Sequence, residues 1–534
     1  MPTYLLIVVA IIFACVLFHK ISDRLGIPTL LAFIVLGLIF GCDGVFKIQF
    51  DDYEITEQLC SVALIFIMFY GGFGTKWSAA KPVALTAVVL SSAGVVLTAG
   101  IVGFFCWQAL DMEPEESFLI GAVISSTDAA SVFSILRSKR LNLKDNTSSL
   151  LEVESGSNDP FSYMLTAVML SVMNGSASGI NIAAMLFKQL FFGAAFGFLI
   201  AVCAWWVMQR FAFSSTGIST VFVLAVALLA YSAPSYLGGN GYLSVYIVGI
   251  YIGNRDIPAK KPLIGFFDAL TGLMQIMLFF LLGLLANPSQ MPEVFIPALF
   301  IALFLTFVAR PAAVFLLMTP FKSSLGQKLV VAWAGLRGAA SIVFAIMATI
   351  DPARTNDDIF HIIFLIVLFS ILFQGSLIPA VSKMLGMIDE KCNVMKTFSD
   401  YSEDVQVRFI EVTVTENHPW ANSMVRDLQL PPETLIALIK RGEERIAPNG
   451  STVLLPGDNV ILSAKAAVET NDFYLVERHV IKSGEWSGKA IAELSMNSSS
   501  LIVMVRRGDD IIIPNGSTIL QDDDIVVINR RTLS

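Results

Sequence analysis

The chain of 534 residues is 55% hydrophobic and 15% charged, and its mean hydropathy is +0.72. Soluble domains carry about a quarter charged residues, so this composition excludes a soluble protein and indicates an integral membrane protein. The net charge of −8 argues against a nucleic-acid partner. The six cysteines form no C-x-x-C pair, so they predict neither a metal site nor a disulfide framework.

Thirteen hydrophobic runs approach or reach the length of about 20 apolar residues that a spanning helix needs. The first run, MPTYLLIVVAIIF, has no basic region and no small-residue cleavage site before His19, so we expect a retained span rather than a signal peptide. The runs lie near residues 4–18, 27–41, 59–75, 83–107, 117–136, 148–173, 183–209, 217–236, 241–254, 263–286, 294–319, 325–349 and 358–385. The sequence therefore predicts a polytopic α-helical membrane protein with about 13 transmembrane helices.

The loops between these runs alternate in charge, and lysine and arginine mark the cytoplasmic side of a membrane protein. Basic residues follow the odd-numbered spans, among them Lys20, Arg24, Lys76, Lys81, Arg137, Lys139, Arg140, Lys144, Arg210, Arg255, Lys260, Lys261, Lys322, Lys383, Lys391 and Lys396. The alternate loops are acidic, with Asp51, Asp52, Glu54, Glu57, Asp111, Glu113, Glu115, Glu116, Asp357 and Asp358. We expect the N-terminus outside the cell and the C-terminus in the cytoplasm.

The fifth span contains the sequence ISSTDAASVF, residues 124–133, with Asp128 at its middle. The residues before Asp128 are Ser, Ser and Thr, which compete for backbone hydrogen bonds and favour helix caps over helix interiors. We expect this span to break near Thr127, so that Asp128 caps a half-helix. A lone capping aspartate inside an unbroken helix is the alternative.

The sixth span contains the acids Glu154 and Asp159 in the sequence LEVESGSNDPF. A carboxylate at membrane depth is costly and usually faces a partner or a water-filled path. Pro160 leaves the carbonyl of Gly156 without its usual donor, and a free carbonyl beside a carboxylate suits a small cation. The alternative is a kinked helix in which these polar residues are structural.

Two arginines are expected inside later spans. Arg337 lies in WAGLRGAASIVFAI, residues 333–346, between two glycines, and it needs an anionic partner because it cannot lose its charge. The sequence GAASIVF resembles DAASVF of the fifth span, as an inverted repeat of broken helices would. Arg310, followed by proline, either snorkels to the cytoplasmic face or has an accessory role.

Helix rotation separates the two acids of the sixth span. Five residues correspond to about 500°, so Glu154 and Asp159 diverge by roughly 140° and cannot face one partner. The simplest assignment pairs Glu154 with Arg337 as a structural ion pair. Asp159, with Asn158 beside it and Asp128 opposite, then faces the transport path and holds either a proton or a monovalent cation.

The composition changes after Met387, and the C-terminal part contains an internal repeat with an offset of 66 residues. LIALIKRGEERIAPNGSTVLLPGDNVIL begins at Leu435, and LIVMVRRGDDIIIPNGSTILQDDDIVVI begins at Leu501. Each copy indicates short strands, a charged hairpin turn and a PNGST turn, and we expect a helix before each, at Trp420–Leu428 and Ser487–Leu494. The predicted organisation is a membrane domain (1–388), a linker (389–403) and two soluble α+β domains (404–468 and 469–534).

The membrane region resembles the monovalent cation/proton antiporter superfamily, in the branch of bacterial NhaP-type and animal sodium/proton exchangers. The residues that carry the resemblance are Thr127-Asp128, Glu154-Ser155, Asn158-Asp159 and Gly335-Leu336-Arg337-Gly338. The resemblance implies an NhaA-like fold with inverted repeats, in which the fifth and twelfth spans are broken and cross near the midplane.

The resemblance also implies the roles of the site residues. Asp159 would bind ion and proton in turn, Thr127 and Ser155 would lend oxygens, and Asp128 would cap the broken helix. The Asn-Asp pair is the family's mark of electroneutral exchange. The third span, LIFIMFYGGF, lacks the acid that some sodium-selective relatives carry there, which argues against a preference for sodium. The expected substrate is potassium, with sodium as the alternative.

The duplicated tail resembles the TrkA-C lobe of domains that regulate potassium conductance. The resemblance implies a homodimer and a regulatory nucleotide or other small ligand, and the alternative is a tail that only stabilises the dimer. We therefore expect a regulated potassium (or sodium)/proton antiporter of the bacterial inner membrane, without enzymatic activity or a cofactor. A tail-gated cation channel and a non-transporting membrane sensor are the alternative functions.

Overall fold

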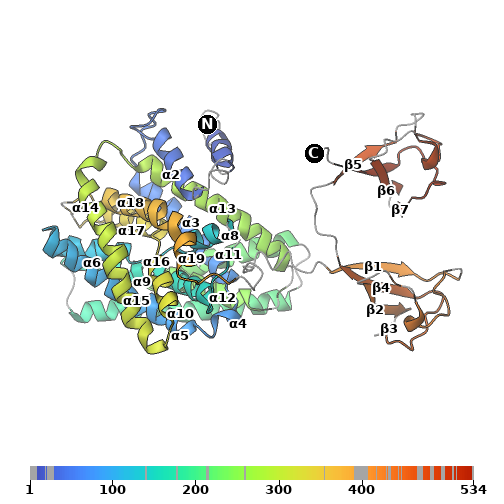
Figure 1. The fold of residues 1–534 in the computed structure, drawn as a ribbon, viewed down its shortest axis with the longest axis horizontal. Helices are drawn as coiled ribbons and strands as arrows, with labels where there is room; N and C mark the ends of the chain where they lie inside the picture. Colours follow the sequence, from blue (N-terminus) through green and yellow to red (C-terminus); the bar gives the residue numbers. More distant parts are fainter. Residues whose placement is uncertain are drawn as a thin grey trace. The chain divides into compact units, whose positions relative to one another are not determined.

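The computed structural model places the chain in two compact units, residues 1–402 and residues 403–534, and each is described by itself. Figure 1 shows helices in the first unit and strands in the second. The predicted linker 389–403 lies outside the described residues except for Asp389. The described residues are 9–18, 20, 29–138, 141–175, 179–211, 216–255, 257, 260–353, 355, 357–389, 407–416, 418–428, 430, 434–442, 444–446, 448–465, 473–480, 486–494, 500–507, 510–512 and 514–531.

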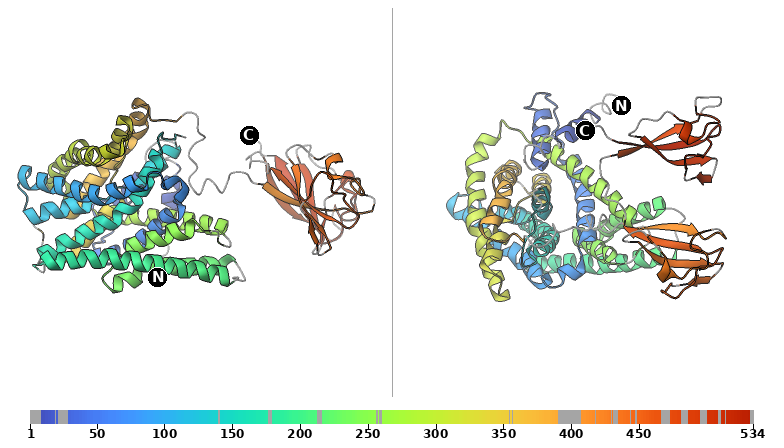
Figure 2. Two further views of the ribbon diagram at one scale, coloured as in Figure 1. Left: turned by 90° about the horizontal axis from the view of Figure 1, so that it is seen from below. Right: turned by 45° about the vertical axis from the view of Figure 1, so that its right-hand side comes forward.

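The first unit is a bundle of helices (Figure 2). Three short π-helical turns, η1, η2 and η4, lie between consecutive helical segments. Its elements are α2 (Thr29–Phe40), α3 (Tyr53–Gly74), α4 (Trp77–Ala80), α5 (Ala84–Val89), η1 (Leu90–Gly94), α6 (Val95–Ala109), α7 (Pro114–Ile124), α8 (Ala129–Ser138), α9 (Thr147–Met173), α10 (Gly179–Arg210), α11 (Thr216–Tyr236), α12 (Gly241–Gly253), α13 (Lys260–Leu285), α14 (Met291–Phe304), η2 (Leu305–Ala309), α15 (Arg310–Met318), η3 (Thr319–Phe321), α16 (Leu325–Trp333), α17 (Ala339–Ile350), α18 (Ile359–Phe369), η4 (Ser370–Gly375) and α19 (Ser376–Met384).

Seven helices in the described part of the chain are long and apolar enough to cross a membrane. They are Tyr53–Gly74, Ala84–Ala109, Gly179–Arg210, Gly217–Tyr236, Lys260–Leu285, Met291–Phe321 and Ile359–Met384. Shorter apolar helices occur at Val9–Phe18, Thr29–Phe40, Gly241–Gly253 and Ala339–Ile350. The expected fifth and twelfth spans are divided into short pieces, and α9 carries acids, so the total of 13 stays a prediction.

Close packing joins α3 to α12 through facing glycines. A β-carbon added at Gly72 of α3 would lie 2.6 Å from the carbonyl oxygen of Tyr246 on α12, and one at Gly249 of α12 would meet the carbonyl of Phe69 at 2.5 Å. Small residues allow membrane helices to approach in this way. The α13 helix packs against α2 and α3, so α2, α3, α12 and α13 form one group of helices. The α9 helix packs against α5 and α7.

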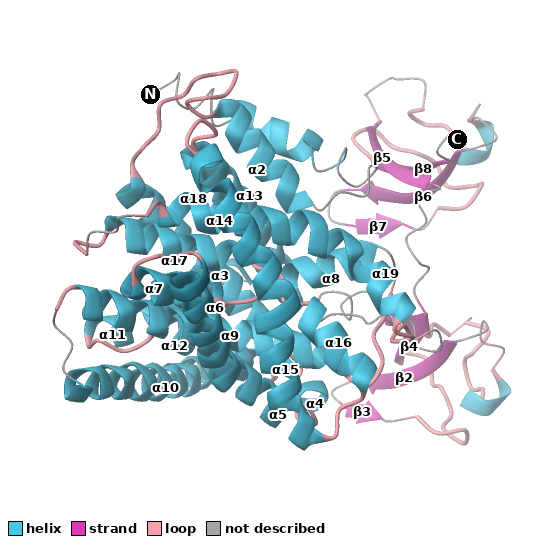
Figure 3. Ribbon diagram, turned by 60° about the vertical axis from the view of Figure 1, so that its left-hand side comes forward, coloured by secondary structure: helices cyan, strands magenta, loops and turns pink. Residues whose placement is uncertain are grey.

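The second unit contains two four-stranded antiparallel sheets, coloured magenta in Figure 3. The first has the order β1-β4-β2-β3 and the second the order β5-β8-β6-β7. Both contain a register shift at equivalent positions, Ile436/Leu438 and Ile502/Met504, so the 66-residue repeat extends to the β-bulge. The strands are β1 (Val407–Thr413), β2 (Thr434–Arg441), β3 (Glu444–Ile446), β4 (Asn459–Lys465), β5 (Phe473–His479), β6 (Ser500–Arg507), β7 (Asp510–Ile512) and β8 (Ile525–Arg531).

The prediction of a helix before each repeat is wrong for the described residues, which form only the 3-10 turns η6 (Val425–Asp427) and η7 (Ile491–Glu493). Asn422 adopts a φ of 62°, and Gly488, 66 positions later, adopts 75°. The left-handed conformation ends any helix. The amides of both residues donate to distant carbonyls, at Leu454 and Leu520, each at 2.8 Å, instead of to a preceding helical turn.

In each copy, an ion pair between a partly exposed arginine and a buried aspartate connects the sheet to the residues after the PNGST turn. In the first copy, the Nε and Nη2 atoms of Arg441 donate to the two carboxylate oxygens of Asp458, each at 2.8 Å, and Nη2 also reaches the Val453 carbonyl. Asp458 is fully buried, and its hydrogen bonds from Arg441 hold its pKa below the ordinary value. Arg507 and Asp524 repeat this arrangement in the second copy at 2.9 Å.

We predict that Arg441→Ala lowers the opening free energy of β4 by about 2–3 kcal/mol, because it leaves the buried Asp458 carboxylate without its charged partner. Hydrogen–deuterium exchange of the full-length protein measures this value. Arg507→Ala is the matched control, and it is expected to destabilise β8 while leaving β4 unchanged. Unchanged protection of β4 in Arg441→Ala would contradict the prediction.

Candidate functional site

Two helices are interrupted at the centre of the first unit, as the sequence analysis predicted. The α7 helix ends at Ile124 and α8 begins at Ala129, while α16 ends at Trp333 and α17 begins at Ala339. The two breaks are in contact, because the Asp128 amide donates to the Leu336 carbonyl at 2.8 Å. A side chain at Gly338 would collide with the Asp128 side chain. Glycine at this position therefore allows the breaks to meet.

Asp128 caps the half-helix that follows the first break. Its Oδ1 accepts from the Ser131 amide at 3.2 Å, and its Oδ2 accepts from the Ser131 hydroxyl at 2.5 Å. A carboxylate at a helix N-terminus satisfies the free amides and interacts favourably with the helix dipole. The predicted break near Thr127 and the capping by Asp128 are both confirmed.

Polar residues of α9 bind the unwound peptide of the first break. The Asn158 side chain accepts from the Thr127 amide at 3.3 Å and donates to the Thr127 hydroxyl at 2.5 Å. The Ser155 hydroxyl donates to the Thr127 carbonyl at 2.8 Å. Asn158 is fully buried, and both the oxygen and the nitrogen of its side-chain amide are hydrogen-bonded to Thr127. In this structure its side chain therefore positions the break.

Asp159 lies at the same break, where it accepts a hydrogen bond from the Ser126 hydroxyl. Asp159 lines a cavity of about 750 Å³ together with Thr127, Asp128, Ser155 and Gly338. Of the five residues predicted to bind the ion, four line this cavity: Asp159, Asp128, Thr127 and Ser155. Asn158 does not line the cavity, but it is hydrogen-bonded to Thr127, which does.

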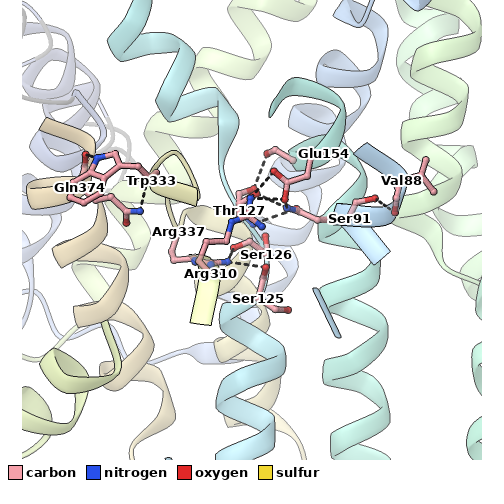
Figure 4. Close-up of polar contacts among 12 residues, drawn as sticks. Val88, Ser91, Ser125, Ser126, Thr127, Glu154, Arg310, Trp333, Arg337 and Gln374 are labelled. Carbon is pink, nitrogen blue, oxygen red and sulfur yellow. Dashed lines mark hydrogen bonds and ion pairs between the residues drawn. The ribbon is translucent and has the colours of Figure 1, made fainter. Parts of the chain in front are cut away.

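The predicted pairing of Glu154 with Arg337 is wrong, because Glu154 pairs with Arg310 (Figure 4). The Nη2 atom of Arg310 lies 2.9 Å from both carboxylate oxygens of Glu154, and all three charged residues are at most 3% exposed. Arg310 therefore does not snorkel to the cytoplasmic face. It links α15 to α9 inside the bundle.

Arg337 is held by carbonyl oxygens instead of by a carboxylate. Its Nη1 donates to the carbonyls of Ser125 and Ser126, at 2.8 and 2.7 Å, directly after the C-terminal end of α7. These carbonyls have lost their helical donors, and the C-terminal end of a helix carries partial negative charge. This local charge explains why Arg337 binds the first break, which the residue spacing alone did not indicate.

The second break is fastened by η4. The Arg337 amide donates to the Ser370 hydroxyl at 3.0 Å, and that hydroxyl donates to the Gln374 side chain at 2.9 Å. Gln374 and Trp333 are joined twice, through Nε2 to the Trp333 carbonyl at 2.6 Å and through the indole nitrogen to the Gln374 carbonyl at 3.1 Å (Figure 4). A π-helical turn often marks a functional region of a helix.

Two acids on the cavity wall were missed in the sequence analysis, Glu152 and Asp268. Glu152 stands seven residues before Asp159, which is close to two helical turns, so both project from one face of α9. Asp268 lies in the middle of the apolar sequence GFFDALTGLM on α13 and accepts from the Tyr70 hydroxyl at 3.1 Å. An acid within a predicted span was the available signal in both cases.

Comparison with known proteins agrees with the family resemblance. The family described as sodium/hydrogen exchanger, transmembrane, matches residues 7–384, and the TrkA-C domain matches residues 409–469 and 475–529. "K(+)/H(+) antiporter NhaP2" of Shewanella sp. (strain ANA-3) is 31% identical over 453 residues, which are 83% of this chain and 78% of that protein.

Two archaeal comparisons extend this similarity. "Na(+)/H(+) antiporter 1" of Methanocaldococcus jannaschii is 30% identical over 353 residues, 64% of this chain and 82% of that protein. The solved structure of the sodium proton antiporter MjNhaP1 from the same organism, at pH 8, matches with a TM-score of 0.63 and 28% identity, over 72% of this chain and 99% of that one. This chain belongs to the sodium/hydrogen exchanger family and carries two C-terminal TrkA-C domains.

Proposed function

We propose that the chain is an electroneutral potassium (or sodium)/proton antiporter of the bacterial cytoplasmic membrane, in which Asp159 binds the cation and the proton in turn. The family consists of transporters rather than enzymes. The observation that supports this role best is that the three central acids have different partners. Glu154 is neutralised by Arg310 and Asp128 caps α8, whereas Asp159 faces the cavity with a hydroxyl from Ser126.

The charge balance of the site supports one-for-one exchange. A carboxylate with little water around it is costly to leave ionised alone, so it takes up a proton or a cation. Its neighbour Asn158 is neutral and Asp128 caps α8, so we take Asp159 as the one carboxylate that exchanges its partner. Binding either K⁺ (or Na⁺) or H⁺ then gives the same net charge at Asp159. Thr127 and Ser155 offer oxygens beside it, as the family resemblance implies.

Alternating access would follow from the position of the cavity between two groups of helices. One wall is formed by residues of α3, α12 and α13, and the other by α8, α9 and the residues around Gly338. Movement of the group that carries Asp159 against the other group would open the cavity to the opposite side. With the N-terminus outside, the basic-loop ends of α3, α9 and α13 would face the cytoplasm.

The tail is the proposed regulator. The TrkA-C match supports two cytoplasmic lobes that bind a nucleotide or another small ligand and change the rate of exchange. Such lobes also support a homodimer of the whole chain. Arg310 is proposed as a structural residue that neutralises Glu154, in place of the role assigned to Arg337 from the sequence.

We predict that Asp159→Asn abolishes cation-dependent proton movement in everted membrane vesicles, because the amide cannot exchange a proton for a cation. Fluorescence of a pH-gradient dye measures the movement after addition of K⁺ or Na⁺. Glu293→Gln removes an exposed acid of α14 and serves as the control with normal exchange. Full exchange by Asp159→Asn would rule out the proposed mechanism.

We predict that Arg310→Met lowers the stability of the protein by about 3 kcal/mol, because it leaves the buried Glu154 carboxylate unpaired. Glu154→Gln is expected to cost a similar amount. The double variant should recover most of the loss, since no unpaired acid remains. Thermal unfolding in detergent tests this cycle, and additive losses in the double variant would show that the two residues do not interact.

We predict that purified protein in proteoliposomes exchanges protons for K⁺ or Na⁺, and that removal of residues 403–534 changes the rate but not the cation preference. The preference is set at Asp159, while the tail acts from outside the membrane region. Exchange is measured with K⁺, Na⁺, Li⁺ and NH₄⁺ in turn. A changed order of preference in the truncated protein would place part of the selectivity in the tail.

A further inference from the structure

The cavity wall formed by α13 carries a line of polar side chains. Asp268, Thr271 and Gln275 are spaced by three and four residues, so they fall on one face of the helix, and all three line the cavity. The rest of α13 is strongly apolar, with the sequence IMLFFLLGLL after Gln275. Polar groups inside a membrane helix usually face a partner or a water-filled path.

Asp268 is oriented by a residue of the third span. The Tyr70 hydroxyl of α3 donates to Asp268 Oδ1 at 3.1 Å, and both residues line the cavity. The third span itself, LIFIMFYGGF, contains no acid. The carboxylate of Asp268 on α13 therefore lies beside the part of α3 that lines the cavity.

The hydroxyl of Thr271 has no hydrogen-bond partner among the described residues, although the residue is only 8% exposed. Two other helical threonines, Thr166 and Thr349, donate to the carbonyl four residues earlier at 2.9 Å, whereas the buried hydroxyl of Thr98, like that of Thr271, has no partner among the described residues. Thr271 does not make that bond. A buried oxygen without a partner, one turn from a carboxylate, is a suitable ligand for a partly dehydrated cation.

Glu152 brings a second carboxylate from the opposite wall. It lies seven residues before Asp159 on α9, a distance of about 10 Å along the helix, and both acids line the cavity. Glu152 is at the end of α9 that follows the basic loop, and Asp268 is at the corresponding end of α13, which begins at Lys260. Both acids therefore stand at the basic-loop end of the path to Asp159.

We propose that Asp268, with Tyr70 and Thr271 beside it and Glu152 on the facing wall, forms an outer cation site. This site takes a monovalent cation from the cytoplasm before the cation reaches Asp159. The inference rests on the proposed function and adds a second cation-binding site to it. Asp268 is exposed, so the site holds a hydrated cation weakly and raises its local concentration.

The test is the apparent KM for the transported cation, measured in everted vesicles, in which the cytoplasmic face is outside. Asp268→Asn is expected to raise this KM by roughly five-fold, the effect of one unit charge at about 4 Å in water, with an unchanged maximal rate. Thr271→Val should raise it by a smaller factor. Asp268→Glu should restore the wild-type value, and Glu293→Gln is the matched control that leaves it unchanged.

Two further measurements separate an outer site from a structural role. In right-side-out vesicles the KM of Asp268→Asn should equal that of the wild type, because the site serves one side only. Added salt should reduce the difference in everted vesicles, because it screens exposed charges. Tyr70→Phe retains the charge and the fold, and combined with Asp268→Asn it should add nothing to the effect.

The outcomes distinguish this proposal from the proposed function. Absence of exchange by the wild-type protein would overturn both. Normal wild-type exchange with an unchanged KM in Asp268→Asn and Thr271→Val would overturn the outer site alone. A reduced maximal rate with unchanged KM in these variants would also overturn it, since that result indicates a structural role.

Discussion

The structure of the membrane unit depends on one constraint: peptide groups that leave a helix inside a bilayer must find partners within the protein. Hydrocarbon offers no hydrogen bonds, so non-helical backbone at membrane depth persists only where protein or a water-filled cavity satisfies it. Here the two breaks satisfy each other through the Asp128 amide and the Leu336 carbonyl. Asn158, Ser155 and Arg337 complete the set from α9 and from the second break.

This constraint also arranges the charges. Arg337 binds two carbonyls at the end of α7 through Nη1 and makes no ion pair with Glu154. The buried Glu154 carboxylate is neutralised by a second buried arginine, Arg310. Asp128 is used by the start of α8. The hydrogen bonds that satisfy the broken helices thus engage the other central acids, and Asp159 is the acid that we propose for exchange.

The sequence predicted the breaks well because their cause is local. Serine, threonine and glycine in an apolar run are poor helix interior residues, so residues 124–128 and 335–338 could be identified directly. The partner of Glu154 could not be predicted, since it depends on which helix lies beside α9 and on the dipole of α7. The predicted helices of the tail are wrong for a related reason. Asn422 and Gly488 adopt a left-handed backbone conformation, and their amides bond to carbonyls of a loop that is distant in the sequence. Glu152 and Asp268 were visible in the sequence, but only the cavity connects them to Asp159.

The cavity lies between two groups of helices, and in the proposed mechanism these groups move relative to each other. The breaks, η4 and the Glu154–Arg310 pair are joined by buried hydrogen bonds and form one group around Asp159. The facing wall is separated from this group by the cavity of about 750 Å³, and on that wall Tyr70 and Asp268 are hydrogen-bonded to each other. Away from the cavity, the Asn240 side chain at the start of α12 donates to the Pro160 carbonyl of α9 at 2.8 Å, and this buried bond would have to break or move with the two groups. An antiporter of this design can keep the geometry at Asp159 fixed while it changes the side from which the carboxylate is reached.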